Sequence, residues 1–298
     1  MISIGPISFF RDTLLKPIIV GSLLLFSAAG NGASVYVMNT DLSGMDLVLD
    51  PVEATATYTR TEFESFASAN LGAGDLQASC SWAYAGTSFN YCSISAGIWP
   101  GDQLRLTNVG VTPVTLGAGA LYVDVFGTYT LGQHPSVSGP GTASASAAAD
   151  LWVFKGTTAY YAGGTHSVGI TFDAGGNIVS SYTNFDNASQ YGGQVDVFTD
   201  TLNELHLGLS VPALTLAPGE YMDLYAVFGV LSSGENAIAL ADFAQTTALS
   251  LVLPAGASLE GNTTVPLEWV RPVPVPAAAY LFASGLVALA GVARRKAA

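Results

Sequence analysis

THSVGITFDAGGNIVSSYTNF, residues 165–185, sets the fold class of this chain. Its two arms are rich in β-branched, aromatic and small polar residues, which favour strands. Between the arms, Asp173-Ala-Gly-Gly-Asn177 supplies residues that tolerate the positive φ of a tight turn. The stretch therefore predicts an antiparallel β-hairpin.

The same pattern continues on both sides of the hairpin. Short apolar runs alternate with Gly, Pro, Asn and Asp clusters, as in an all-β sandwich or barrel. Pro218-Gly219 and Pro254-Ala-Gly256 provide turn chemistry after two later strands. Further strands are expected at residues 54–63, 104–109, 120–130, 149–154 and 167–172.

Helices should be minor, because no long run carries an apolar stripe with a period of 3.6 residues. The Ala-rich residues 143–149 are compatible with a short helix, a strand or a loop. The expected fold class is an all-β, antiparallel β-sandwich of jelly-roll or Ig-like type over residues 34–268. An N-terminal signal helix and a single C-terminal transmembrane helix are expected to flank it.

Residues 1–33 have the organisation of a secretory signal peptide. Arg11 and Lys16 precede an apolar run at residues 17–29, and small residues follow it. A basic start, a short apolar run and a small-residue exit are the features that signal peptidase recognises, and the run is too short to span a bilayer comfortably. We expect this segment to be removed on export.

The C-terminus carries a second hydrophobic segment. A Pro-rich linker at residues 269–276 leads into residues 277–298, which begin with an uncharged stretch and end in Arg294, Arg295 and Lys296. Such a stretch predicts a transmembrane helix with a basic tail. Because basic flanks stay in the cytoplasm, residues 34–268 should lie on the far side of the membrane.

This C-terminal region resembles the PEP-CTERM sorting domain, and most of all its VPxPA variety. The resemblance rests on the motif Val273-Pro274-Val275-Pro276-Ala277, the hydrophobic stretch after it and the Arg-Arg-Lys tail. It implies cleavage by an exosortase of a Gram-negative bacterium, after an inner-membrane intermediate. The product would reach the outer surface or the extracellular matrix; an ordinary C-terminal anchor is the alternative.

The body between the two ends is strongly acidic. Arg60, Arg105 and Lys155 are its only basic residues and face 21 acidic residues between positions 34 and 268, a net charge of −18. Such a body repels phosphate backbones, which argues against a nucleic-acid partner. Calcium is a possible cofactor, and a polar turn is the alternative reading of its weak candidate ligands, Asp186, Asp196 and Asp200.

Cys80 and Cys92 are the only cysteines. In an exported chain this pair predicts a disulfide, either between the arms of a hairpin or as a loop clamp. Closing a loop of this size should stabilise the fold by about 3 kcal/mol.

No motif for nucleophilic or cofactor-dependent catalysis is present, so we do not expect this protein to be an enzyme. Paired carboxylates are the remaining catalytic pattern, with Glu62 and Glu64, or Asp196 and Asp200, sharing a strand face by period two. Glycoside hydrolysis is therefore the least favoured function. The histidines show no metal-binding spacing and are His134, His166 and His206.

Two functions are open, the first from the chain ends and the lack of a catalytic motif, the second from the aromatic residues. Aromatic side chains either stack on sugar rings or fill the core. The first function is a structural or exopolysaccharide-associated protein of the cell surface or matrix. The alternative is a carbohydrate-binding β-sandwich module. The aromatic candidates are Trp82, Tyr84, Tyr91 and Trp99 around the cysteines, and Trp152, Tyr160 and Tyr161 further along the chain.

Overall fold

The computed structural model is all-β in the part of the chain that it describes, namely residues 35–41, 44–50, 53–59, 62–86, 90–98, 104–244, 247–260, 267–268 and 270–272. Its two large sheets are antiparallel apart from one short parallel pair. The prediction of an all-β, antiparallel fold is confirmed. The expected signal peptide and C-terminal membrane segment lie outside the described residues. Within the described ranges, no helix is long and apolar enough to span a membrane.

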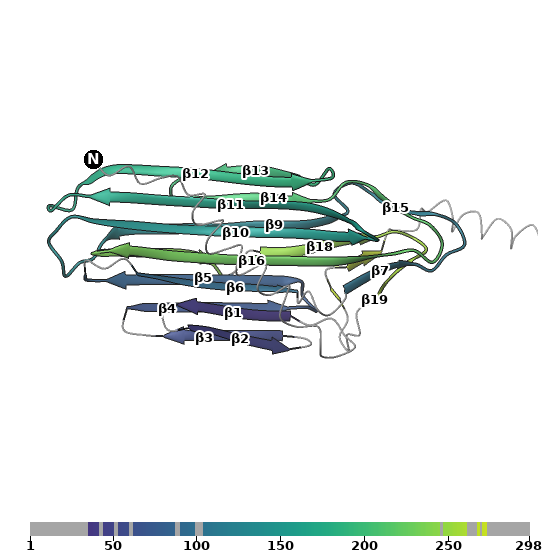
Figure 1. Cartoon of the computed structure of the whole chain (residues 1–298), viewed down its shortest axis with the longest axis horizontal. Coiled ribbons are helices and arrows are strands. Elements are labelled where there is room, and N and C mark those ends of the chain that lie inside the picture. Colours follow the sequence, from purple (N-terminus) through teal and green to yellow (C-terminus); the bar gives the residue numbers. More distant parts are fainter. Residues whose placement is uncertain are drawn as a thin grey trace, which may run out of the picture.

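Sheet 1 has nine strands, and its long central strands run the length of the molecule (Figure 1). Strand β7 (Leu104–Asn108) pairs with β16 and with β19 (Ala257–Glu260) beside the main order. The main order is β12 (Ile178–Gln190), β11 (Thr158–Phe172), β10 (Gly141–Lys155), β16 (Tyr221–Glu235), β6 (Asn90–Ile98), β1 (Val35–Asp41) and β2 (Gly44–Asp50).

Sheet 2 also has nine strands. Its long strand β9 (Leu121–Gln133) pairs with β14 (Glu204–Ser210) on one side, and with β17 (Ala237–Phe243) and β18 (Thr247–Leu253) on the other. A separate two-stranded sheet joins β8 (Val114–Leu116) to β15 (Leu214–Leu216). The remaining strands of sheet 2 are β13 (Gln194–Asp200), β5 (Asp75–Tyr84), β4 (Phe63–Asn70), β3 (Glu53–Thr59) and β20 (Val270–Pro272).

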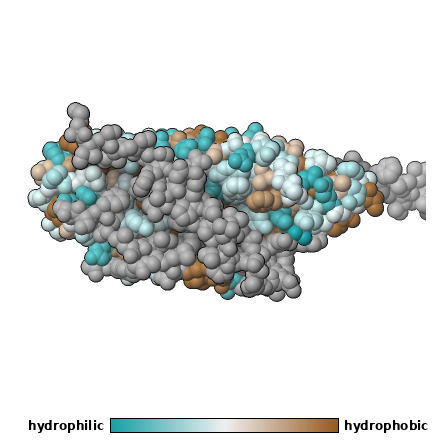
Figure 2. All heavy atoms as spheres, viewed as in Figure 1, coloured by the Kyte–Doolittle hydropathy of each residue, from teal (hydrophilic) through white to brown (hydrophobic). Residues whose placement is uncertain are grey.

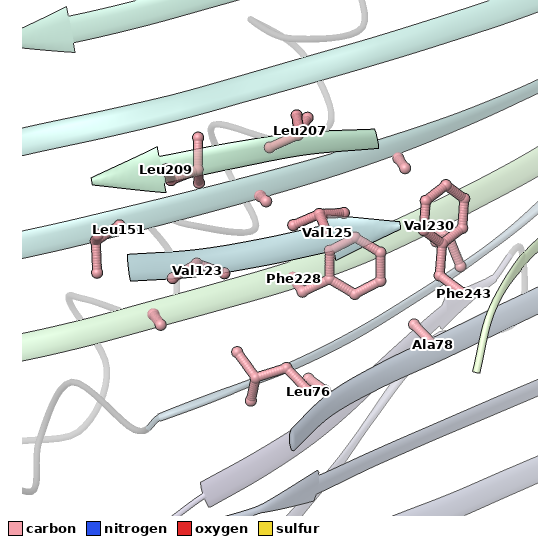
Figure 3. Packing of buried hydrophobic residues seen from close by; sticks show 14 of the residues in the cluster. Leu76, Ala78, Val123, Val125, Leu151, Leu207, Leu209, Phe228, Val230 and Phe243 are labelled. Atoms are coloured by element: carbon pink, nitrogen blue, oxygen red, sulfur yellow. The ribbon is translucent and has the colours of Figure 1, made fainter. Parts of the chain in front are cut away.

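The two sheets pack face to face over one apolar core. Figure 3 shows Val123 and Val125 of sheet 2 near Phe228 of sheet 1, with Phe243 beside them. Phe228 and Phe243 are fully buried, with ring centroids 5.4 Å apart. Alternation along the strands produces this core, because every second side chain of a strand points inward. Burial of apolar area on this scale is the main stabilising term of the fold.

The Ala-rich segment is a strand. Ala143, Ala145, Ala147 and Ala149 of β10 are buried, whereas the alternate residues Ser144, Ser146 and Ala148 are half-buried. The period is therefore two, which a helix would not give. Composition alone left this segment open because alanine suits a helix as well as a tightly packed sheet.

The predicted hairpin at residues 165–185 is confirmed. Strands β11 and β12 pair antiparallel, and the turn between them spans residues 173–177. Asp173 Oδ1 accepts hydrogen bonds from the backbone N–H groups of Gly175 and Asn177 at 2.8 and 2.9 Å. These bonds, led by that from Asn177, lower the pKa of Asp173. Gly176 has φ 81°, which explains the glycine at this position.

The prediction of one strand over residues 54–63 is wrong. Strand β3 ends at Thr59, and β4 begins at Phe63 and pairs antiparallel with β3. The buried positions change parity between the two strands: Ala54 is buried on β3, and Phe63 and Ala67 are buried on β4. A continuous strand keeps one parity on each face, so this change marks a turn.

The disulfide links the two sheets. Cys80 lies on β5 of sheet 2 and Cys92 on β6 of sheet 1, with Cα atoms 6.4 Å apart. The predicted bond is present, but β5 and β6 are not hydrogen-bonded arms of one hairpin. Close by, the buried Ser232 hydroxyl of sheet 1 donates to the Cys80 carbonyl at 2.7 Å. A covalent bond and a hydrogen bond therefore join the sheets at one place.

Candidate functional site

The outer side of sheet 1 carries a group of aromatic side chains that alternation directs away from the core. On β10, Leu151 and Val153 are buried, so Trp152 and Phe154 point outward. We call this group, together with one cation, the aromatic face: Trp152, Phe154, Tyr161, Tyr221, Tyr225 and Arg105.

Trp152 is the centre of the aromatic face. Its partners across the neighbouring strands are Tyr161 on β11 and Tyr225 on β16. The Trp152 ring centroid lies 4.1 Å from that of Tyr161, and 5.9 Å from that of Phe154 with the planes at 8°. Phe154 in turn meets Tyr225 edge-on at 5.4 Å. Three adjacent strands thus contribute one continuous aromatic surface.

Tyr161 of β11 is held in place by a carboxylate of the neighbouring strand β10. Its hydroxyl donates to Asp150 Oδ1 at 2.6 Å. The ring reaches that carboxylate by lying over Gly163, where a Cβ would overlap both the Tyr161 hydroxyl and Asp150. Gly163 is therefore needed for this close approach, and the ring next to Trp152 is fixed before any ligand arrives.

The aromatic face ends, on the side of β7, in an ion pair between Arg105 and Asp223. Arg105 Nε donates to Asp223 Oδ1 at 2.7 Å, and Nη2 donates to Oδ2 at 3.2 Å. The guanidinium carbon lies 3.6 Å from the ring centroid of Tyr221, which is a cation–π contact. The Asp223 hydrogen bonds raise the pKa of Arg105, so the guanidinium keeps its charge.

Polar groups at the border are set to donate and accept hydrogen bonds. Burial, and then the Asp223 carboxylate, raise the pKa of Tyr225 to about 12, so its phenol keeps its proton at neutral pH. The ring faces are apolar, while the hydroxyls and carboxylates lie around them. Hydrophobic and hydrophilic residues are mixed over the right-hand part of the molecule, where β7, the end of β10 and the start of β16 lie (Figure 1 and Figure 2). This arrangement suits a ligand that has both apolar faces and polar edges.

The other predicted aromatic residues are dispersed. Trp82 belongs to the core at 4% exposure, and Tyr84 packs on it with centroids 5.7 Å apart. Tyr91 is half-buried on β6, and Tyr160 lies against the core on β11. Trp99 lies outside the described residues. Only Trp152 and Tyr161 of the predicted set come together in the aromatic face.

The calcium candidates do not converge. Asp186 lies on β12 of sheet 1, Asp196 on the outer side of sheet 2 opposite Gly208, and Asp200 points inward to His166. Across the described segments, no three His, Cys, Asp or Glu side chains are grouped to hold a metal ion.

The prediction that Asp196 and Asp200 share a strand face is wrong. A β-bulge between Val197 and Thr199 shifts the register of β13 against β14. The extra residue turns Asp200 to the face opposite that of Asp196. Of the other predicted carboxylate pair, Glu64 is exposed on β4 and Glu62 precedes the strand.

His166 forms a buried polar network that its spacing in the sequence does not predict. Its side chain is 0% exposed, and Nε2 lies 2.8 Å from Asp200 Oδ1. Because a carboxylate only accepts, Nε2 carries the proton, and Nδ1 accepts from the Tyr129 hydroxyl at 3.0 Å. Burial lowers the pKa of His166, although Asp200 opposes this shift. The network links β11 of sheet 1 to β9 and β13 of sheet 2.

The two remaining histidines lie elsewhere. His206 is half-exposed and pairs with Asp124 at 3.0 Å on the outer side of sheet 2. His134 Nδ1 accepts from the Ser136 backbone N–H at 3.2 Å near the end of β9. The predicted sorting motif, Val273 to Ala277, and the basic tail, Arg294 to Lys296, lie outside the described residues.

Comparison with protein-family models and with curated proteins gives no match to this chain. Within the described part of the molecule, the aromatic face has the most clearly organised surface chemistry.

Proposed function

We propose that this protein is an exported surface or extracellular-matrix protein that binds polysaccharide through the aromatic face. The observation that carries the proposal is the clustering of Trp152, Phe154, Tyr161 and Tyr225 on the outer side of a sheet. Aromatic rings normally add stability by filling the core. A contiguous group of them on a sheet exterior favours an interaction site.

The chemistry of sugars fits this surface. A pyranose ring presents C–H groups on its faces, and these pack on the electron-rich faces of Trp and Tyr. Its hydroxyls lie at the ring edge, where they meet Asp150, Asp223 and Arg105 as hydrogen-bond partners. Because Tyr161 and Arg105 are already held by hydrogen bonds, little side-chain freedom is lost on binding.

In this proposal, the two chain ends carry the signals for export and sorting. A signal helix at residues 1–33 directs export, and signal peptidase removes it. The motif at residues 273–277, the transmembrane helix and the basic tail form a PEP-CTERM-like signal for an exosortase. The body, a sandwich of jelly-roll or Ig-like type, is thereby delivered to the outer surface or matrix without any catalytic role.

Retention on polysaccharide tests the binding proposal. Protein from cells expressing the full chain is passed over immobilised exopolysaccharide of the host. Replacing Trp152 by Ala should weaken retention by about tenfold or more, equivalent to about 1.4 kcal/mol. Phe198→Ala is the matched control, because Phe198 is 58% exposed on the other sheet. Equal retention of the wild type and Trp152→Ala would refute the assignment.

The cellular distribution of variants with an altered C-terminus tests the sorting proposal. Deleting residues 272–298 should change the distribution of the protein between membrane, medium and matrix. Replacing Pro274 and Pro276 by Ala keeps the hydrophobic stretch and the basic tail, and should leave uncut protein in the inner membrane. An unchanged distribution of both variants would contradict the sorting proposal.

A structural role in the matrix is the second candidate. The covalent link between the sheets at Cys80 and Cys92 favours it, because such a bond suits a protein that must stay folded outside the cell. A protein that reaches the matrix but is retained by no polysaccharide would have this role.

A further inference from the structure

The structure describes the side chains of two cations, Arg105 and Lys155, and Arg105 belongs to the aromatic face. Lys155 directly follows Phe154 on β10 and by alternation points to the opposite side of sheet 1. A cation at the site would attract an anionic ligand unless it were already paired with a carboxylate. Arg105 and Lys155 are both paired in this way.

Arg105 already has an anionic partner. Two of its N–H groups are directed at the two oxygens of Asp223, a bidentate arrangement that matches the geometry a uronate carboxylate would need. Its guanidinium plane also packs on Tyr221. The Asp223 and Arg105 side chains are only 15% and 25% exposed, so an incoming carboxylate would have to displace a partly buried partner.

Lys155 is engaged in the same way. Its Nζ lies 3.2 Å from Glu220 Oε2 and donates to the Thr215 carbonyl at 2.6 Å. On the aromatic side of the sheet, Asp150, which receives the Tyr161 hydrogen bond, adds a second carboxylate to Asp223. Among the described residues, the aromatic face therefore has two carboxylates against one cation, and the acidic body adds long-range repulsion of anions.

We infer that the aromatic face selects uncharged polysaccharide and excludes acidic polysaccharide, because Arg105, the cation of the face, is already paired with Asp223 and a second carboxylate, Asp150, lies on the same side. This inference rests on the proposed function and names its ligand class. Neutral sugar hydroxyls can donate to Asp223 and Asp150 without breaking the ion pair between Arg105 and Asp223. Binding should then depend little on ionic strength, since no new charge pair forms.

The test compares two kinds of polymer on the full-chain protein. A panel of neutral glucans, mannans and galactans represents uncharged ligands, and polygalacturonate represents acidic ones. The wild type should be retained by at least one neutral polymer at low and at high ionic strength, and by polygalacturonate at neither. Trp152→Ala should lower the neutral retention by about tenfold or more, and Phe198→Ala should not.

A second experiment looks for a gain of binding to acidic polysaccharide. Asp223→Asn removes the negative charge that neutralises Arg105, so the variant should acquire retention on polygalacturonate that high salt abolishes. Glu220→Gln, which affects only the more exposed Lys155 pair, is the matched control and should acquire much less. If Asp223→Asn folds and gains nothing, Asp223 is not what excludes acidic sugar and the inference is overturned.

The failures of the two proposals are distinguishable. Wild-type retention on polygalacturonate that is lost in Trp152→Ala and in high salt would overturn the charge selection and leave polysaccharide binding standing. Absence of retention on every polymer would overturn polysaccharide binding itself.

Discussion

Reduction of the disulfide between Cys80 and Cys92 should lower the free energy of unfolding by about 3 kcal/mol. The bond closes a loop with a sequence separation of 12, and a cross-link of this length removes about that much loop-closure entropy from the unfolded chain. Both cysteines are fully buried, so the reduced thiols stay in place as small apolar groups and leave no cavity.

Urea unfolding of the oxidised and reduced protein measures the difference. With a slope of about 3 kcal/mol per M, the midpoint should fall by about 1 M on reduction. Mass spectrometry confirms the state of the bond in each sample. The urea midpoint of the double variant Cys80→Ala with Cys92→Ala should not change when reductant is added.

Equal midpoints for the oxidised and reduced protein would refute this reasoning. That result would mean that the sheets are held together at this point by packing and the Ser232 hydrogen bond alone. A loss well above 5 kcal/mol would also contradict it, because loop closure cannot supply so much.

Three further outcomes are expected. Phe243→Ala removes a fully buried ring from between the sheets and should cost about 3–5 kcal/mol in urea unfolding; a cost below about 1 kcal/mol would contradict the packing described. Because burial lowers the pKa of His166 from its ordinary 6.5, the unfolded chain takes up this proton first, so stability should fall as the pH drops below 6.5 and stay level above it. His166→Gln should remove this component of the pH dependence, and the half-exposed His206→Gln should keep it. Gly163→Val should displace Tyr161 and weaken polysaccharide retention with the far-ultraviolet circular dichroism unchanged; full retention would show that Tyr161 is not part of the site.

The sequence predicts local elements well where a turn and an alternating pattern coincide. The hairpin at residues 165–185 has both, and its turn at residues 173–177 is where the chain reverses. The break between Thr59 and Phe63 has no Gly or Pro, and only the change of parity in the buried positions marks it. That change can be read from a sequence when the inward face of each strand is tracked separately.

Sheet assignment and bulges are harder to predict. The spacing of Cys80 and Cys92 predicts their bond but does not say that it joins opposite sheets. A period of two places Asp196 and Asp200 on one face of the strand. A single extra residue in β13 instead turns the Asp200 side chain to the opposite face. Neither feature leaves a signal in composition or hydrophobic pattern.

The aromatic face is partly visible in the sequence. Trp152 and Tyr161 lie close together in the chain and were candidates, whereas Arg105 and Tyr225 come from strands distant in the sequence. Long-range pairing of β10 with β16, and of β16 with β7, brings these residues together. Such pairings depend on which sheet edge each strand finds, and no local pattern encodes that choice.

The most direct test of polysaccharide binding is to observe Trp152 while the polymer is bound. Side-chain N–H signals of tryptophan in the nitrogen-15 spectrum of the full chain in detergent report each indole separately, and Trp152→Phe identifies its own signal. On addition of a retained neutral polysaccharide, the Trp152 signal should shift, and that of Trp82, which is 4% exposed in the core, should not. A Trp152 signal that stays in place while the polymer is bound would contradict the account.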